Sequence, residues 1–472
     1  MTEAAAQPDA SAGRRIQLVL SVTFAFFLCM LNTHAINIAL PAIADYFQAG
    51  IGMAARVSLI YMVMMTCLLL VFGNLGDRLG LKRMFVSGYA LLAAGSLLSG
   101  LAPCLGILIA ARAIQGVSAS MLMAAGSAII ARHLPPDRRG WAFGIQGMFS
   151  AAGAALGAPL GGLVTHYAGW QWVFLGITPF CLLAMTLALK SIPGDRPSAP
   201  ARQVLASFDW PGAVMSVAGF FLLLYGLNSA RQLGWASPVI IGCLAAGVLL
   251  LILFAAWERK CAGPLLNIAA FRNRAFACAN LAGVAAFMVM SGSNFLMPFY
   301  LVLRQRTTAA EAGFSIMLFS AFFLLISPAA GRASDRMHPA RISAAGMVCA
   351  SAACVFFMLA LTAPGLAPAL VFLGMFGVAY ALFVSPNNNL IMSMAPPAML
   401  GSTSAIFGAV NSFGIASGLA LFEAIFSAAA AAPPGADAAL ASGFQTAYGV
   451  GALLCMLAFF LSMAAGRAGK RN

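Results

Sequence analysis

Fourteen long apolar segments, each of about 20 residues or more, divide this chain. A helix of that length spans the hydrocarbon core of a bilayer, and helices or closed barrels are the structures that satisfy backbone hydrogen bonds in lipid. Only 8% of the 472 residues are charged, against about 25% in soluble domains. We therefore predict an all-α membrane protein with fourteen transmembrane helices, at 16–41, 53–73, 84–102, 105–130, 141–163, 170–190, 210–228, 237–257, 275–303, 311–331, 341–362, 367–393, 402–429 and 444–466.

The Lys and Arg residues gather on one side of these predicted spans. Of the 26, 21 lie in segments on the side of the N-terminus, four lie on the opposite side, and Arg112 alone lies within a span. Because cytoplasmic loops carry an excess of Lys and Arg, we expect both termini in the cytoplasm. The net charge of +14 then reflects membrane topology, and no folded basic domain is left to bind nucleic acid.

A short phrase occurs twice, at 73–83 and at 331–341, and in each copy Asp-Arg follows a glycine by four residues. The copies are 258 residues apart, and prolines and glycines of 135–157 recur at 396–418, 261 residues later. Repeated blocks of spans are typical of transporters, in which two halves move about a central site. We therefore predict two six-helix bundles around an additional helix pair, a 6 + 2 + 6 layout.

This layout divides the chain into seven parts. They are a cytoplasmic tail at 1–15, the N-terminal bundle at 16–190, a linker at 191–209, two extra helices at 210–257, a cytoplasmic loop at 258–274, the C-terminal bundle at 275–466 and a tail at 467–472.

The sequence resembles the major facilitator superfamily. The first phrase is similar to the loop 2–3 signature of that superfamily, and span 4 carries a similar signature in Arg112-Ala-Ile-Gln115-Gly116. Fourteen spans, together with Asp209-Trp210-Pro-Gly212 and Leu233-Gly234-Trp235, resemble its drug:proton antiporter branch. The resemblance covers essentially the whole chain.

The repeated phrase suggests a conformational latch. Asp77 ends a span among cations, and charge-assisted hydrogen bonds there could break when the halves separate. The alternative is that the cations merely fix the topology. Ser334 replaces the inner glycine in the second copy, so we expect a weaker latch there. The predicted latch residues are Gly73, Asp77, Arg78, Gly80, Lys82, Arg83, Asp335 and Arg336.

Small residues in span 5 predict a close helix–helix seam, in which glycines let two backbones approach. The same residues resemble the span 5 signature of the superfamily's antiporters, which implies export, although Ala158 stands where that signature has proline. Ordinary packing is the alternative. The predicted seam residues are Gly153, Gly157, Pro159, Gly161 and Gly162.

Arg112 is the most costly residue of the predicted spans. A charge at mid-span costs about 2.5–3.5 kcal/mol on insertion scales, and such residues usually face a cavity. Asn32 and His34 lie at a comparable depth, so we expect all three in one polar cavity; a snorkelling Arg112 and a packed His34 are the alternatives. The predicted cavity residues are Asn32, His34, Asn37, Arg112, Gln115 and Asn411.

Proton coupling requires a titratable group, and span 1 lacks the expected one. Asn32 stands where the antiporter branch has a carboxylate. His34, and Glu423 near the outer mouth, are the candidate proton carriers. With Asn32 neutral, the cavity around Arg112 should be electropositive, which disfavours cations and suits neutral or anionic compounds.

We therefore predict a secondary active exporter of small amphiphilic molecules or drugs, driven by protons. The alternative is an uptake symporter or facilitator for a small metabolite, anionic ones included; a membrane receptor or scaffold is a more distant reading. No phosphate-binding loop, nucleophile arrangement or metal spacing occurs, so we expect no enzyme activity, cofactor or metal. The expected partners are the substrate, protons and the lipid of the inner membrane, with the chain acting as a multi-pass monomer.

Overall fold

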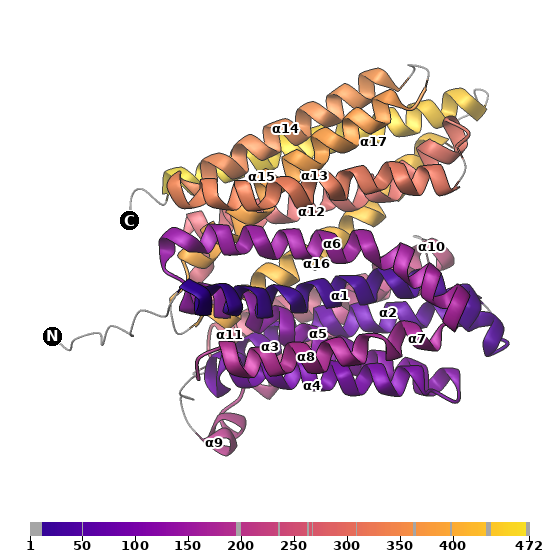
Figure 1. Cartoon of the computed structure of the whole chain (residues 1–472). Helices are drawn as coiled ribbons and strands as arrows, with labels where there is room; N and C mark the ends of the chain where they lie inside the picture. The colour runs from indigo at the N-terminus through magenta and orange to yellow at the C-terminus, as the bar shows by residue number, and fades with distance from the viewer. Residues whose placement is uncertain are drawn as a thin grey trace.

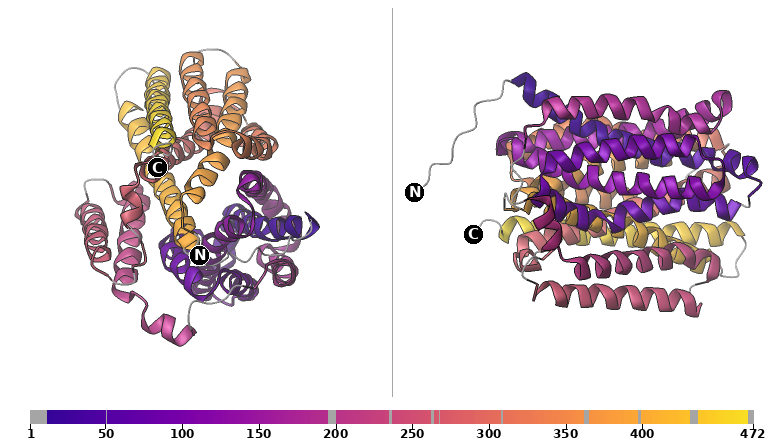
Figure 2. Two further views of the ribbon diagram at one scale, coloured as in Figure 1. Left: turned by 90° about the vertical axis from the view of Figure 1, so that its left-hand side faces the viewer. Right: turned by 90° about the horizontal axis from the view of Figure 1, so that it is seen from below.

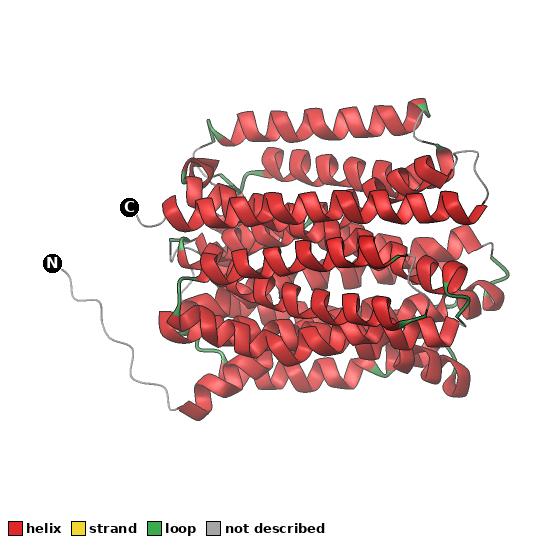
Figure 3. Cartoon of the chain, turned by 90° about the horizontal axis from the view of Figure 1, so that it is seen from above, coloured by secondary structure: helices red, strands yellow, loops and turns green. Residues whose placement is uncertain are grey.

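The computed structural model describes residues 12–49, 51–194, 200–234, 237–261, 264–266, 268–307, 309–361, 365–396, 399–430 and 436–468. In these ranges it consists of helices joined by short loops (Figure 3). The predicted tails fall outside the described residues over 1–11 and 469–472, as does the predicted linker over 195–199.

Seventeen α-helices, one 3₁₀ turn (η1) and one π-helical turn (η2) are described. They are α1 (Ala12–Tyr46), α2 (Ile51–Cys67), α3 (Leu69–Leu79), α4 (Leu81–Gly100), α5 (Leu105–His133), α6 (Pro136–Ala168), α7 (Gln171–Leu175), α8 (Ile177–Ser191), α9 (Ala201–Ala206), α10 (Trp210–Leu233), α11 (Pro238–Glu258), η1 (Ile268–Arg272), α12 (Arg274–Phe299), η2 (Tyr300–Arg304), α13 (Ala309–Arg336), α14 (Pro339–Ala360), α15 (Ala367–Ser393), α16 (Leu400–Ala430) and α17 (Ala436–Ala468).

Proline and glycine set several of the helix ends. Pro136, Pro238 and Pro339 begin α6, α11 and α14, at a position where the missing N–H would have no intrahelical partner. Gly80, with φ of +105°, separates α3 from α4, and Gly169, with φ of +92°, follows α6. Such φ values favour glycine because it has no Cβ. The chain therefore changes direction where the sequence provides these residues.

The prediction of fourteen spans in a 6 + 2 + 6 layout is wrong. Twelve of the described helices are long and apolar enough to cross a membrane, and thirteen if the bent pair α2 and α3 counts as one span. The expected span 53–73 breaks at Leu68, where the helix axes bend by 48°. The expected span 84–102 lies in α4, which has 20 residues, begins with charged Lys82 and Arg83 in its first turn, and is not among the twelve.

The helices run roughly side by side and form two groups (Figure 1). Helices α1–α8 make one group, α12–α17 make the other, and α6 and α16 lie where the groups meet. Helices α10 and α11 pack on each other at the side of the molecule, next to α2 and α16 (Figure 2). Helix α1 begins and α17 ends at the same end of the molecule, which we call the terminal end.

Each group of helices is packed around a large hydrophobic cluster. The first fills the α1–α8 group but also includes Leu390 of α15 and Phe407 of α16. The second fills the α12–α17 group and is rich in aromatic contacts, such as those of Phe372 with Phe357 and Tyr448. Because Leu390 is near the end of α15 and Phe407 near the start of α16, the groups share a core toward the terminal end.

Candidate functional site

The carboxylate of Asp77 caps a helix of the opposite group. Asp77 lies in the last turn of α3. Its Oδ1 accepts a hydrogen bond from Gly401 N at 2.7 Å, and its Oδ2 accepts from Ser402 N at 2.8 Å and Ser402 Oγ at 2.9 Å. Gly401 and Ser402 are in the first turn of α16, where N–H groups lack intrahelical acceptors and the helix dipole favours an anion. Asp77 thereby joins the two groups.

Asp335 makes the equivalent contact in the opposite direction. It lies at the end of α13, and its Oδ1 accepts from Gly140 N at 2.6 Å while its Oδ2 accepts from Trp141 N at 2.8 Å. Both donors lie in the first two turns of α6. Each half of the repeat therefore binds main-chain amides near the start of a helix in the opposite group, with three hydrogen bonds at Asp77 and two at Asp335.

Four glycines bring these helices into backbone contact. A Cβ on Gly73 would lie 2.6 Å from the carbonyl oxygen of Gly401, and one on Gly401 would lie 2.5 Å from that of Gly73. Gly140 and Gly331 approach each other in the same way. Because a side chain would prevent this approach, each glycine pair places the aspartate at the facing helix. We call this set the terminal closure: Gly73, Asp77, Gly140, Gly331, Asp335 and Gly401.

The other residues of the repeated phrase contact neighbouring chain segments or solvent. Arg78 Nη1 donates to Ser207 O at 3.4 Å, and Lys82 Nζ donates to Leu189 O at 2.7 Å. Gly80 forms the turn between α3 and α4. The cations Arg83 and Arg336 have exposed side chains. The Asp77 carboxylate is therefore bound by main-chain amides of α16, which the sequence motif does not indicate.

Arg112 is fully buried in α5, with 0% of its surface exposed. Its Nε donates to Val57 O at 3.1 Å, and its Nη1 donates to Asn32 Oδ1 at 3.1 Å and Gln115 Oε1 at 2.6 Å. The guanidinium carbon lies 4.3 Å from the centroid of the Tyr61 ring, which is a favourable cation–π distance. All four partners are neutral, so none of them balances the charge of Arg112.

A hydrogen-bonded network extends from this cation. Gln115 Nε2 donates to Ser96 Oγ at 2.9 Å, and Asn32 Nδ2 donates to Gln115 Oε1 at 3.4 Å. Arg112 Nη2 has no hydrogen-bond partner among the described residues. We call these five residues the Arg112 cluster: Asn32, Tyr61, Ser96, Arg112 and Gln115. Its free N–H groups can bind an acceptor that enters the cluster.

Among the described residues, neither His34 nor Asn37 forms a hydrogen bond with the Arg112 cluster. His34 is exposed, and its Cβ lies opposite Gly157 of α6, where an added Cβ would be 2.7 Å away. Asn37 is exposed and its Oδ1 accepts from Ser58 Oγ at 2.8 Å. The structure therefore brings only part of the predicted cavity together around Arg112.

The two predicted residues of α16 lie in the other group of helices. Asn411 Oδ1 would lie 3.6 Å from a Cβ on Gly283 of α12, and it has no hydrogen-bond partner among the described residues. Glu423 is half-buried about three turns further along α16. Neither belongs to the Arg112 cluster.

Three of the predicted seam residues pack directly on α1. Gly153, Gly157 and Gly161 recur every four residues and so share one face of α6; a Cβ on any of them would clash with the backbone or Cβ of α1. Pro159 is exposed, and a Cβ on Gly162 would meet only Ile38 Cγ2, at 3.5 Å. The seam therefore consists of one glycine face of α6 against α1.

We expect Gly161→Ala to destabilise the protein by about 1–3 kcal/mol, because its Cβ would lie 2.6 Å from Ala35 Cα and force α6 away from α1. The melting temperature in detergent measures this change. Gly162→Ala is the matched control and should melt like the wild type, since its Cβ makes an ordinary contact. Equal melting temperatures for the two variants would contradict the seam.

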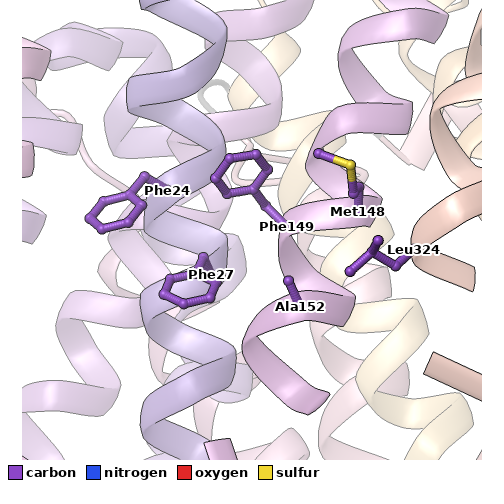
Figure 4. A pocket seen from close by; sticks show the side chains of 6 residues that line it. All are labelled: Phe24, Phe27, Met148, Phe149, Ala152 and Leu324. Atoms are coloured by element: carbon purple, nitrogen blue, oxygen red, sulfur yellow. The ribbon is translucent and has the colours of Figure 1, made fainter. Parts of the chain in front are cut away.

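An apolar cavity of about 280 Å³ lies where helices of both groups meet (Figure 4). Its lining comes from α1, α6 and α13, and consists of Phe24, Phe27, Met148, Phe149, Ala152 and Leu324. Phe27 stacks on Phe24 with ring centroids 5.6 Å apart and meets Phe149 edge-on at 6.5 Å. Aromatic rings and a methionine can adapt to varied apolar ligands.

The sequence alone does not identify several residues of the terminal closure, the Arg112 cluster and the apolar cavity. The repeat matches Gly140 with Gly401 but does not indicate that both are hydrogen-bond donors. The apolar composition gave no signal for Phe27 or Tyr61. Among the residues that the structure describes, no three His, Cys, Asp or Glu side chains come together as a metal site.

The comparisons with known proteins are consistent in the class they indicate. The model of the Major Facilitator Superfamily matches residues 22–419. The riboflavin transporter RibZ of Clostridioides difficile is 29% identical over 409 residues, which cover 87% of this chain and 88% of RibZ. The multidrug resistance protein Stp of Mycobacterium tuberculosis is 26% identical over 417 residues, which cover 88% of this chain and 76% of Stp.

A solved structure shares the fold. The crystal structure of the human organic anion transporter MFSD10 superposes with a TM-score of 0.69 over 97% of this chain and 100% of that one. The sequence identity is 16%, so this likeness concerns the arrangement of helices alone.

Proposed function

Because this chain belongs to the major facilitator superfamily, we propose that it is a secondary active transporter that exports small amphiphilic molecules or drugs by proton-driven alternating access. We place the terminal end in the cytoplasm of a bacterial cell, since the Lys and Arg excess lies there. The chain then acts as a monomer in the inner membrane.

The terminal closure is the observation that carries this proposal. Its hydrogen bonds connect the two groups at the terminal end, from Asp77 to the first turn of α16 and from Asp335 to the first two turns of α6. Breaking them, together with the packing of Leu390 and Phe407 on the first cluster, would let the groups separate there. Such a rigid-body movement between two arrangements is how alternating access works. The closure is thus the latch of the transport cycle.

The apolar cavity supports the substrate class. Side chains of both groups line it, so a ligand bound there would contact both halves and respond to their separation. Phe24, Phe27 and Phe149 offer ring faces and edges to a flat apolar molecule. Relatives described as drug-resistance proteins are in keeping with this class.

Uptake of a small anionic metabolite, by a symporter or a facilitator, is the second candidate. It is favoured by the Arg112 cluster, in which a buried cation has neutral partners and one free nitrogen. An anion entering the cluster would satisfy that nitrogen and balance the charge. A relative described as a riboflavin transporter is in keeping with a metabolite as substrate.

Everted membrane vesicles with an imposed pH gradient test the proposal. We expect addition of an amphiphilic substrate to dissipate the gradient, and we expect His34→Gln or Glu423→Gln to uncouple transport from it. Glu311→Gln, an exposed acid at the start of α13, is the control. Accumulation of substrate in intact cells, with no effect on the gradient in vesicles, would instead establish the uptake candidate.

A further inference from the structure

The loop before α10 and the loop after α11 both form hydrogen bonds with α3, the helix that carries Asp77. We call these two loops, with the adjoining ends of α10 and α11, the base of the helix pair. Asn74 Nδ2 donates to Pro264 O at 3.0 Å and to Leu265 O at 3.4 Å. One turn later, Arg78 Nη1 donates to Ser207 O at 3.4 Å. Ser207 precedes α10, and Pro264 and Leu265 follow α11. The helix pair therefore holds α3 from both of its connecting loops.

Two buried carboxylates organise this base. Asp209, which is 6% exposed, accepts through Oδ1 from Gly212 N and Trp257 Nε1, each at 3.0 Å. Glu258, which is 4% exposed, accepts from the main-chain amides of 265–266, each at 3.2 Å. Asp209 thus fixes the start of α10 against α11. Glu258 fixes the loop whose carbonyl oxygens receive the Asn74 side chain.

Gly212 allows the two carboxylates to meet. A Cβ on Gly212 would lie 2.9 Å from Glu258 Oε1 and would also clash with Asp209 Oδ2. The spacing of Asp209 and Gly212 therefore lets both acids approach the first turn of α10. Phe208 and Leu265, the apolar residues beside these acids, are buried in the same cluster as Leu75 of α3. Packing and hydrogen bonds thus hold the base on α3 together.

The second half of the repeat has a different residue at the corresponding position. Arg332 follows Asn74 by the 258-residue offset of the phrase, and its side chain is exposed where that of Asn74 is buried. The contact between α13 and α6 therefore lacks the Asn74 hydrogen bonds that hold α3. The two contacts of the terminal closure have unequal support.

We propose that Asn74, Asp209 and Glu258 are positioning residues, through which α10 and α11 hold α3 in the arrangement that lets Asp77 cap α16. The helix pair then stabilises the contact between Asp77 and α16. The contact between Asp335 and α6 does not receive this support. Loss of this support would weaken the contact of Asp77 with α16 without removing any residue of the closure.

Hydrogen–deuterium exchange of the purified full-length chain tests this directly, because the donors of the closure are main-chain amides. Asn74→Ala and Glu258→Gln should each speed exchange of the Gly401 and Ser402 amides by at least about fivefold. Exchange at Gly140 and Trp141 should stay at the wild-type rate. Arg332→Ala, the matched variant in the other half, should change neither pair.

The pattern across the two contacts separates positioning from general destabilisation. Equal acceleration at both amide pairs, or acceleration at neither, would overturn the proposal. A variant that melts at the wild-type temperature and still exchanges faster only at Gly401 and Ser402 supports it. Because exchange needs no substrate or proton gradient, this result does not depend on whether the protein exports or imports.

Discussion

Asp77→Asn should lower the initial transport rate by about tenfold or more. Its carboxylate accepts three hydrogen bonds from Gly401 and Ser402. An amide can keep one acceptor on that side, but its NH₂ group would face the N–H and hydroxyl donors of Ser402. Hydrogen bonds to a charged group contribute about 1.5–3 kcal/mol each, and 1.4 kcal/mol shifts an equilibrium tenfold. The closed arrangement should therefore lose most of its population.

Initial rates in everted vesicles measure this effect at matched protein levels. Asp335→Asn should have a smaller effect, because its carboxylate accepts two hydrogen bonds. Asp45→Asn, which changes an exposed acid beyond the seam region of α1, is the control for charge alone. If Asp77→Asn transports like this control, the terminal closure has no role in the cycle.

Asn32→Asp should change substrate preference from neutral or anionic compounds toward cations. The new carboxylate would lie where Asn32 Oδ1 now accepts from Arg112 Nη1 at 3.1 Å. Opposite charges at about 4 Å attract by about 4 kcal/mol at an effective dielectric constant of 20. The ion pair would neutralise the Arg112 cluster, so we expect export of a fluorescent lipophilic cation to rise about tenfold and anion transport to fall.

Asn37→Asp is the matched control for this substitution. It places the same charge on the same helix, but at an exposed position that contacts Ser58 and lies outside the Arg112 cluster. It should leave the preference for cations or anions unchanged. Efficient export of lipophilic cations by the wild type, or no change in Asn32→Asp, would show that the charge of Arg112 does not select substrates.

The apolar segments correctly predicted an all-α membrane protein, because a helix that spans a bilayer needs a long apolar run. The repeat related 73–83 to 331–341 and so pointed to Asp77 and Asp335 together. It also matched Gly140 with Gly401, which the structure places at the corresponding contacts with Gly331 and Gly73. The sequence does not show that Gly140 and Gly401 contact the repeated phrase of the opposite half. Residue types carry no information about which main-chain N–H groups act as donors. Asp77 was expected among cations; its carboxylate accepts hydrogen bonds from two main-chain amides and the Ser402 hydroxyl, with Arg132 near enough to act on its charge.

Depth along a span was a poor guide to the polar cavity. Asn32 and His34 lie at similar depths, but residues two apart on a helix point about 200° apart. Asn32 consequently faces Arg112, whereas His34 faces α6. The span count failed for two other reasons. The segment 84–102 lies in α4, which is not among the helices long and apolar enough to cross a membrane. Apolar runs do not show the bend at Leu68 between α2 and α3.

The hydrogen-bond donors and acceptors of the terminal closure differ in how well they tolerate substitution. Main-chain N–H groups persist whatever side chain evolution places at Ser402 or Trp141, except proline. Each acceptor, by contrast, is one carboxylate that a single nucleotide change can remove. Natural variation that alters how readily this protein opens should therefore accumulate at Asp77 and Asp335, while Trp141 can change in identity and Ser402 can change with the loss of its hydroxyl donor alone. Gly140 and Gly401 are fixed by the close helix contacts and not by the hydrogen bonds.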